Sequence, residues 1–342
     1  MTPDWVFKNC KVNFIVRSEP ELTCTELVKT ILSGKNDFGN IEGLSYRYHD
    51  KTFHNSDRTF VNDLTDYPFP DYGSLPMHLY RYSTGDLEWP FTIMLSSRGC
   101  PGQCVFCLKK MMPSRYRAVS AKKVYEEIKY LVSEFGIKSI YFQDWEFVID
   151  RARVKELCLI LIESTDINIT WGCSARASSL DREILTLMKR AGCKLINFGF
   201  ESGSNKVVGL SQKGVTLSRV TEVANLCREL DINLRAFCLA NLPGENRKTL
   251  KESAKFIVNN DLNVPRINTP IPYPGTKLAK MVGSNSWGGA LDLAGKVNTV
   301  LRPERARKIL RNYIWRERYG QLFFVNPKFL RYAFSILRNK FF

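Results

Sequence analysis

The sequence contains no long hydrophobic run, no low-complexity tract and no internal repeat beyond the alternation described below. Its longest aliphatic-rich segment, Leu157–Ile162, is far too short to cross a bilayer. The first residues, Met1 to Trp5, lack the basic start and the apolar run of a signal peptide. These absences predict a cytoplasmic protein whose thiols stay reduced. The composition, 44% hydrophobic and 25% charged, excludes a wholly disordered or fibrous chain.

Histidine is also scarce, with three residues against ten cysteines in a chain of 342. The irregular spacing of the cysteines in so long a chain argues against a disulfide scaffold. The length is enough for one large α/β domain or two smaller ones, with a sizeable buried core.

The formal net charge of +16 suggests an anionic partner such as nucleic acid, a membrane surface or a phosphorylated substrate. More than half of this charge lies after residue 300, where 11 Lys or Arg residues face 2 Asp or Glu residues. Residues 329–341 place Phe329, Phe334 and Phe341 on one helical face with basic residues opposite. Such a helix can dock on the main domain, which we favour, or lie peripherally on an anionic membrane. Charge alone is not specific for nucleic acid, so we do not expect nucleic acid as a partner.

Apolar runs typical of strands alternate with helical patterns from residue 91 onward. The runs lie near residues 91–97, 138–143, 167–173, 194–200, 232–240 and 264–271. Successive starts are 47, 29, 27, 38 and 32 residues apart. This is the spacing of βα units, which form a parallel sheet covered by helices. Six units predict an incomplete barrel or an open, doubly wound sheet.

Three cysteines follow the first predicted strand at C-x3-C-x2-C spacing, as Cys100, Cys104 and Cys107. Thiolates that converge on one centre favour an iron–sulfur cluster, zinc or copper(I). No fourth cysteine lies nearby, and an open coordination position is typical of catalytic sites. A zinc site with a distant fourth ligand, or three buried thiols, remain alternatives. For the other seven cysteines we expect packing in the core. They are Cys10, Cys24, Cys158, Cys173, Cys193, Cys227 and Cys238.

The cysteine motif, with Phe106 before its third cysteine, resembles the signature of the radical S-adenosylmethionine superfamily, and the resemblance extends over about residues 90–275. It implies a (βα)6 partial TIM barrel. It also implies that the three cysteines bind a 4Fe-4S cluster, whose fourth iron is chelated by S-adenosylmethionine. Phe106 would then lie against the adenine.

Polar residues follow three of the predicted strands, where the active site of a parallel barrel forms. The resemblance implies that Asp144, with Glu146 in reserve, binds the amino group of S-adenosylmethionine. It implies that Arg176 contacts the carboxylate or ribose of the cofactor, and that Glu201 accepts hydrogen bonds from the ribose hydroxyls. Solvated turns and surface salt bridges are the alternatives for these residues. Lys213 fits a solvated loop.

Residues 11–72 resemble the end of the cobalamin-binding module that precedes the barrel in one branch of this superfamily, through segments such as Val16–Thr23 and Ile41–Arg47. None of the three histidines lies in the Asp-x-His-x-x-Gly arrangement that supplies the cobalt ligand in that branch. Too little chain precedes residue 90 for a complete cobalamin domain, so cobalamin is only a possible cofactor.

We therefore expect an α/β chain of four parts. They are an N-terminal α/β remnant (1–72), a linker (73–90), the partial barrel (91–283) and a basic helical tail (284–342). The expected activity is reductive cleavage of S-adenosylmethionine to start methyl transfer or rearrangement on a small organic or lipid-like substrate. The expected electron donor is a flavodoxin or ferredoxin. Two other hypotheses are a partner protein that needs a separate cobalamin subunit and a zinc-bearing RNA-binding protein.

Overall fold

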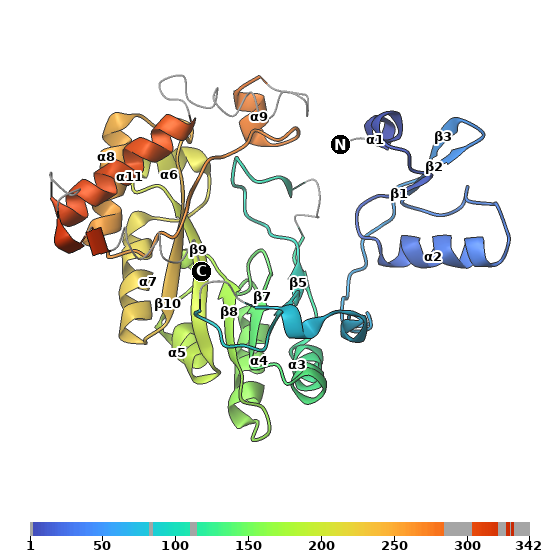
Figure 1. Cartoon of the computed structure of the whole chain (residues 1–342), viewed down its shortest axis with the longest axis horizontal. Helices are drawn as coiled ribbons and strands as arrows, with labels where there is room; N and C mark the ends of the chain where they lie inside the picture. The colour runs from blue at the N-terminus through green and yellow to red at the C-terminus, as the bar shows by residue number, and fades with distance from the viewer. Residues whose placement is uncertain are drawn as a thin grey trace. The chain divides into compact units, whose positions relative to one another are not determined.

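The six predicted strands form one parallel sheet in the computed structural model (Figure 1). The structure describes residues 3–81, 85–109, 115–283, 303–320, 326–328 and 330–331. The strands are β4 (Phe91–Met94), β7 (Ser139–Phe142), β8 (Thr170–Ser174), β9 (Cys193–Glu201), β10 (Asn233–Leu239) and β11 (Ile267–Asn268). Their order in the sheet is β4-β7-β8-β9-β10-β11, so each strand pairs in parallel with the next one along the chain. Sequential parallel pairing of six strands confirms the predicted partial barrel.

Helices connect these strands. They are α3 (Ala121–Phe135), α4 (Arg151–Glu163), α5 (Arg182–Arg190), α6 (Asn205–Ser211), α7 (Leu217–Glu229) and α8 (Arg247–Asn259). Capping residues in the sequence determine where these helices begin and end. The side chain of Ser120 accepts a hydrogen bond from the Lys123 amide at the start of α3, and Gly136 ends this helix in a left-handed conformation. Asn246 and Thr249 form a capping box at the start of α8.

The core lies between the sheet and these helices. Trp171 is fully buried on β8, with the ring of Phe142 edge-on at 5.6 Å between centroids and the ring of Phe147 at 5.5 Å. Five of the seven cysteines outside the motif are buried, as predicted. Cys10 and Cys24 are exposed, so the prediction of core packing was wrong for these two.

The segment predicted as a linker, residues 73–90, packs on the main domain. Met77 belongs to the large core, and Leu87 joins a cluster with Phe91, Tyr141 and Leu195. Asp86 pairs with Arg235 on β10. Residues near the amino ends of the strands therefore hold this segment in place.

Residues up to Asp63 form most of a smaller unit, whereas the sequence prediction placed the boundary at residue 72. The unit contains α1 (Pro3–Asn9), β1 (Phe14–Val16), α2 (Glu21–Leu32), β2 (Leu44–Tyr48) and β3 (Lys51–His54). Both strand pairs, β1 with β2 and β2 with β3, are antiparallel. The predicted α/β character is present, but the sheet is antiparallel, unlike the parallel sheet of a doubly wound domain.

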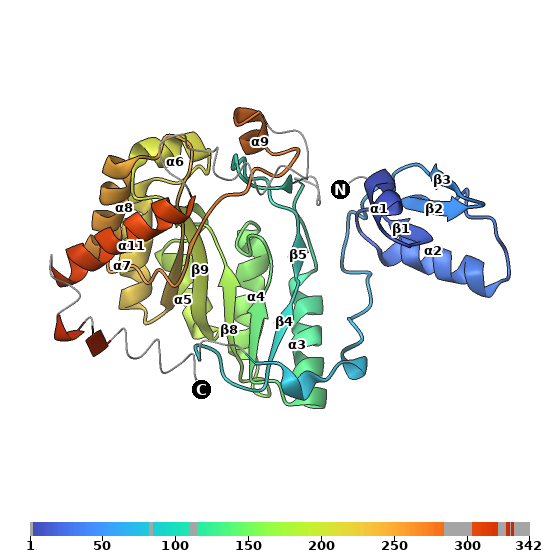
Figure 2. The ribbon, with the colours of Figure 1, turned by 45° about the horizontal axis from the view of Figure 1, so that its top comes forward.

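The predicted basic tail contributes α11 (Pro303–Tyr319), which lies along α8 in both ribbon views (Figures 1 and 2). Ala306 and Leu310 on α11 are buried in the main core. Most of the predicted aromatic face after residue 328 lies outside the described residues. Among the residues that the structure does describe, no helix is both long and apolar enough to span a bilayer.

Gly192, just before β9, provides a test of the sheet geometry. Its φ is +94°, and a Cβ atom there would overlap the backbone oxygen of Ile169. We expect Gly192→Ala to lower the free energy of unfolding by roughly 2 to 4 kcal/mol, measured by urea denaturation. The matched Gly209→Ala variant, in α6 with open space around the glycine, should be neutral or stabilising. Equal effects of the two variants would contradict this account.

Candidate functional site

The cysteine loop begins at the end of β5 (Ser97–Arg98), which pairs with β6 (Arg117–Ala118). The amide of Cys107 donates to the carbonyl oxygen of Cys104 at 3.2 Å, which closes a turn between two of the thiols. Buried Val105 lies inside this turn. Its amide donates to the Ser211 oxygen on α6 at 3.0 Å, and its oxygen accepts from Leu278 of α9 (Lys277–Met281) at 2.8 Å. Val105 therefore fixes the turn to α6 and α9, which follow β9 and β11 along the chain.

Arg176, directly after β8, lies against the cysteine sulfurs. Its Nη2 atom is 3.4 Å from the Sγ of Cys104 and 3.7 Å from the Sγ of Cys100. Its Nη1 atom donates to the backbone oxygen of Lys213 at 3.0 Å. A Cβ atom at Gly102 would overlap the guanidinium, so a glycine at this position is needed for the approach. The structure thus brings together two of the predicted cysteine ligands and the predicted arginine.

Glu146 lies behind this guanidinium. Its Oε2 atom is 3.8 Å from the Nε of Arg176, and its side chain is 1% exposed. Neither carboxylate oxygen forms a hydrogen bond of good geometry among the described residues, although the amides of Val148 and Arg176 and the hydroxyl of Ser179 lie near enough to lower its pKa. Burial raises the pKa of Glu146 from 4.5 to about 7, against the opposing effect of Arg176. A buried carboxylate with free acceptor positions is suited to receive a cationic or hydrogen-bonding ligand.

Asp144 has a different environment from Glu146. Its Oδ1 accepts from the Ser96 amide at 2.8 Å, and its Oδ2 accepts from the hydroxyls of Ser96 and Ser97 at 2.7 and 2.5 Å. The guanidinium of Arg153 lies 3.8 Å from Oδ2 and also donates to the Val119 oxygen at 3.2 Å. Burial raises the pKa of Asp144, while the bonds from Ser97 and Ser96 and the charge of Arg153 oppose this. These contacts tie the end of β7 to the strand that enters the cysteine loop, so they favour Glu146 over Asp144 as a ligand-binding carboxylate.

Glu201 ends β9 with a φ of +67° and forms a nearly buried ion pair with Lys213. A Cβ atom at Gly199 would overlap the Glu201 carboxylate, so the side chain folds back over its own strand. Lys213 is only 12% exposed, which overturns its interpretation as a solvated loop residue. The backbone oxygen of Lys213 accepts a hydrogen bond from Arg176, so the Glu201–Lys213 pair adjoins the cysteine site.

Phe106, the remaining predicted cofactor contact, is half-buried in the cysteine turn.

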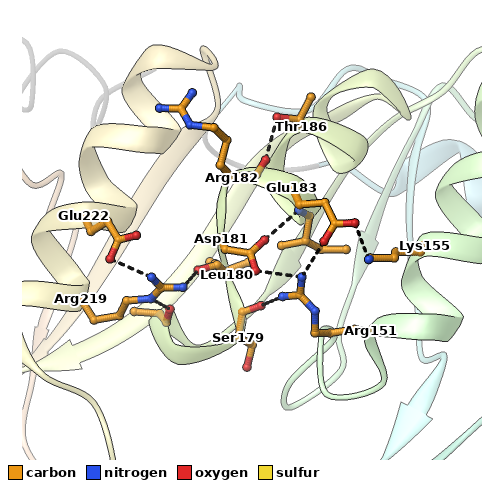
Figure 3. Close-up of polar contacts among 12 residues, drawn as sticks. Arg151, Lys155, Ser179, Leu180, Asp181, Arg182, Glu183, Thr186, Arg219 and Glu222 are labelled. Carbon is orange, nitrogen blue, oxygen red and sulfur yellow. Dashed lines mark hydrogen bonds and ion pairs between the residues drawn. The ribbon is translucent and has the colours of Figure 1, made fainter.

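A network of polar contacts from α4 and α7 fixes the segment that follows Arg176 (Figure 3). Arg151 of α4 donates to the Ser179 oxygen at 3.1 Å and pairs with Asp181 at 2.9 Å. From α7, Arg219 donates to the oxygen of Ala177 at 3.2 Å and to that of Leu180. Two arginines, one from α4 and one from α7, therefore hold the short 3-10 turn Ala177–Ser179 and the residue after it, which limits the positions that Arg176 can take.

Three cysteine thiolates with a guanidinium beside two of them are a donor set that fits an iron–sulfur cluster. Among the residues that the structure describes, no three His, Cys, Asp or Glu side chains lie close enough to hold one metal ion. Cys100 and Cys104 instead face the guanidinium of Arg176. The sulfur ligands of a 4Fe-4S cluster lie farther apart than those of one zinc ion, and a cation beside them balances the negative charge of the thiolates.

Comparisons with known proteins identify similar families and relatives. The family model described as the radical SAM superfamily matches residues 94–257. An uncharacterized methyltransferase of Pyrococcus horikoshii is 30% identical over 287 residues, which cover 83% of this chain and 61% of the relative. The anaerobic magnesium-protoporphyrin IX monomethyl ester cyclase of Rubrivivax gelatinosus is 26% identical over 337 residues, covering 95% and 58%.

A solved structure shares the fold. It is the radical S-adenosylmethionine methyltransferase TsrM from Kitasatospora setae, with cobalamin and a [4Fe-4S] cluster bound. The TM-score is 0.59 at 20% identity, with 73% of this chain and 50% of that chain covered. The chain therefore spans about half to three fifths of the length of these relatives.

The raised pKa of Glu146 gives a pH-dependent prediction for the metal-free protein. Between pH 4.5 and about 7 the folded state holds a proton that the unfolded state has lost, so the stability contribution of Glu146 falls as pH rises through this window. Glu146→Gln keeps a neutral side chain. Its free energy of unfolding, relative to wild type, should rise by up to about 3 kcal/mol between pH 4.5 and 7.5 in urea titrations.

Glu163, an exposed carboxylate at the end of α4, provides the matched control. The Glu163→Gln variant should follow the wild-type pH profile. A Glu146→Gln profile that also parallels wild type would show that the Glu146 carboxyl is solvated in the folded protein.

Proposed function

The chain belongs to the radical SAM superfamily, and we propose that it is an enzyme that reductively cleaves S-adenosylmethionine at a 4Fe-4S cluster held by Cys100, Cys104 and Cys107. The observation that carries this proposal is the contact of the Arg176 guanidinium with two of these sulfurs, backed by buried Glu146. The bound cluster would supply the electron that cleaves S-adenosylmethionine. The chain's own residues hold, orient and shield the reactants.

Charge complementarity suggests how the cofactor's methionine part is held. We assign its carboxylate to Arg176, because a guanidinium offers a planar pair of donors to a carboxylate. We assign its ammonium group to Glu146 in place of Asp144, because the buried oxygens of Glu146 lack the well-formed hydrogen bonds that Asp144 accepts. An ammonium group would favour the ionised form of Glu146, so its raised pKa should fall when S-adenosylmethionine binds.

The remaining site residues have supporting parts in this proposal. Asp144 positions the strand that enters the cysteine loop through Ser96 and Ser97. Glu201 would accept hydrogen bonds from the ribose hydroxyls while Lys213 holds its carboxylate in place. The ring of Phe106 would lie against the adenine. Water exclusion by the packed loop would protect a reactive radical from quenching.

We infer methyl transfer or rearrangement on a small organic or lipid-like substrate, because the relatives include methyltransferases and an ester cyclase by name. These relationships favour the enzyme over the zinc-bearing RNA-binding protein and over the non-catalytic partner. Cobalamin binding by this chain stays a prediction, supported by its presence in the solved relative. A flavodoxin or ferredoxin as electron donor, a cytoplasmic location and a peripheral membrane contact of the tail also stay predictions.

Iron content and product formation test the proposed function. Anaerobically reconstituted protein should be brown, contain about four irons per chain, and release 5′-deoxyadenosine from S-adenosylmethionine with dithionite. Cys104→Ala should lose most of the iron and at least 100-fold of the product. Cys24→Ala removes an exposed thiol from the smaller unit and should leave both unchanged. Stoichiometric zinc without iron, or full product formation by Cys104→Ala, would contradict the proposal.

A further inference from the structure

A cavity lies away from the cysteine site, between α11, the end of α8 and the residues leading into β11. Its volume is about 630 Å3. Arg266 and Ile267 line it from the amino end of β11, whereas the cysteine loop contacts elements after the carboxyl ends of the strands. Ile257, Leu262 and Val264 provide apolar parts of the wall.

The charged residues around this cavity are strongly unbalanced. Five cationic side chains line it, against the single carboxylate of Glu304. They are Arg266, Arg307, Lys308, Arg311 and Arg318. Arg318 faces exposed Asp261 at 3.7 Å. No ion pair is formed by Arg266, Arg307 or Lys308 within the described part of the chain. Like charges gathered around one concavity repel each other, and a bound anion relieves this repulsion.

The arrangement on α11 is ordered along one helical face. Arg307, Arg311 and Trp315 follow one another at intervals of four residues, so they lie on the same side of the helix. The guanidinium of Arg311 lies 5.3 Å from the centre of the Trp315 ring. The cavity therefore combines guanidinium groups, which favour phosphate, with an aromatic ring and an aliphatic wall, which favour a planar apolar group.

We propose that this cavity binds a phosphate-bearing small molecule with a planar ring, of the nucleotide class. Its volume lies within the range of small-molecule sites. A small ligand is favoured over nucleic acid because Ile257, Leu262 and Val264 form an apolar wall, whereas nucleic-acid binding depends mainly on contacts of basic and polar groups with phosphates. This binding is separate from the proposed cleavage of S-adenosylmethionine.

Isothermal titration calorimetry of the full chain tests the proposal with GTP, inorganic pyrophosphate and guanosine as probes. Saturating S-adenosylhomocysteine is included to keep nucleotides out of the cysteine site. We expect GTP to bind, pyrophosphate to bind at least threefold more weakly, and guanosine to give no measurable heat. Raising the salt concentration should weaken GTP binding, because the contacts are ionic.

The double variant Arg307→Glu and Arg311→Glu should weaken GTP binding at least tenfold. The matched double variant Arg305→Glu and Arg316→Glu makes the same charge change on the same helix, at exposed positions outside the cavity. Its affinity should stay within threefold of wild type. If the first variant fails to fold, Arg307→Gln with Arg311→Gln, which retains polar side chains, replaces it with the same expected loss.

Three results would overturn the proposal. They are no GTP binding by wild type, equal losses in the two double variants, and binding of a single-stranded 20-nucleotide RNA that is tighter than GTP and is lost in the cavity variant. The last result would assign the surface to nucleic acid.

Discussion

The contact between the Arg176 guanidinium and the sulfurs of Cys100 and Cys104 is the interaction on which the rest of the site depends. It requires a glycine at position 102, because any larger residue would overlap the guanidinium. It also requires that the end of β8 and the cysteine loop be fixed independently. Arg151 and Arg219 fix the segment after β8. The cysteine loop is fixed because the Val105 amide donates to α6 and the Val105 oxygen accepts from α9. A site assembled from separately fixed parts loses little entropy when ligands bind.

Two strand ends, those of β7 and β9, place three carboxylates near this contact, and each carboxylate has different partners. Asp144 accepts three hydrogen bonds and faces Arg153, Glu201 pairs with Lys213, and Glu146 keeps unused acceptor positions beside Arg176. Burying a carboxylate without full compensation is costly, and such groups are concentrated at functional sites. Glu146 is therefore the carboxylate with the clearest capacity to bind a cationic ligand, whereas Asp144 holds the strand that enters the cysteine loop and Glu201 is already paired with Lys213.

Much of the barrel was predictable from sequence, because each βα unit is local and its apolar pattern is regular. The cysteine motif was visible for the same reason, since its spacing within one loop carries the chemistry. Lys213 and Arg153 gave no such signal, because each pairs with a carboxylate earlier in its own βα unit, Glu201 or Asp144, across a loop whose course the sequence pattern does not define. The choice between Asp144 and Glu146 depended on which carboxylate meets Ser96 and Ser97, a tertiary contact. Cys10 and Cys24 were misjudged because residue type alone does not reveal that the smaller unit leaves them exposed.

We propose that the cysteine loop and Arg176 form one site that binds a cluster and S-adenosylmethionine together. Electron paramagnetic resonance of the reconstituted, dithionite-reduced chain, recorded with and without S-adenosylmethionine, tests it most directly. The account predicts a cluster signal whose g-values shift when S-adenosylmethionine is added, with a weaker shift in Arg176→Lys, where the planar pair of donors is lost. A cluster signal that S-adenosylmethionine leaves unchanged in wild type would contradict it.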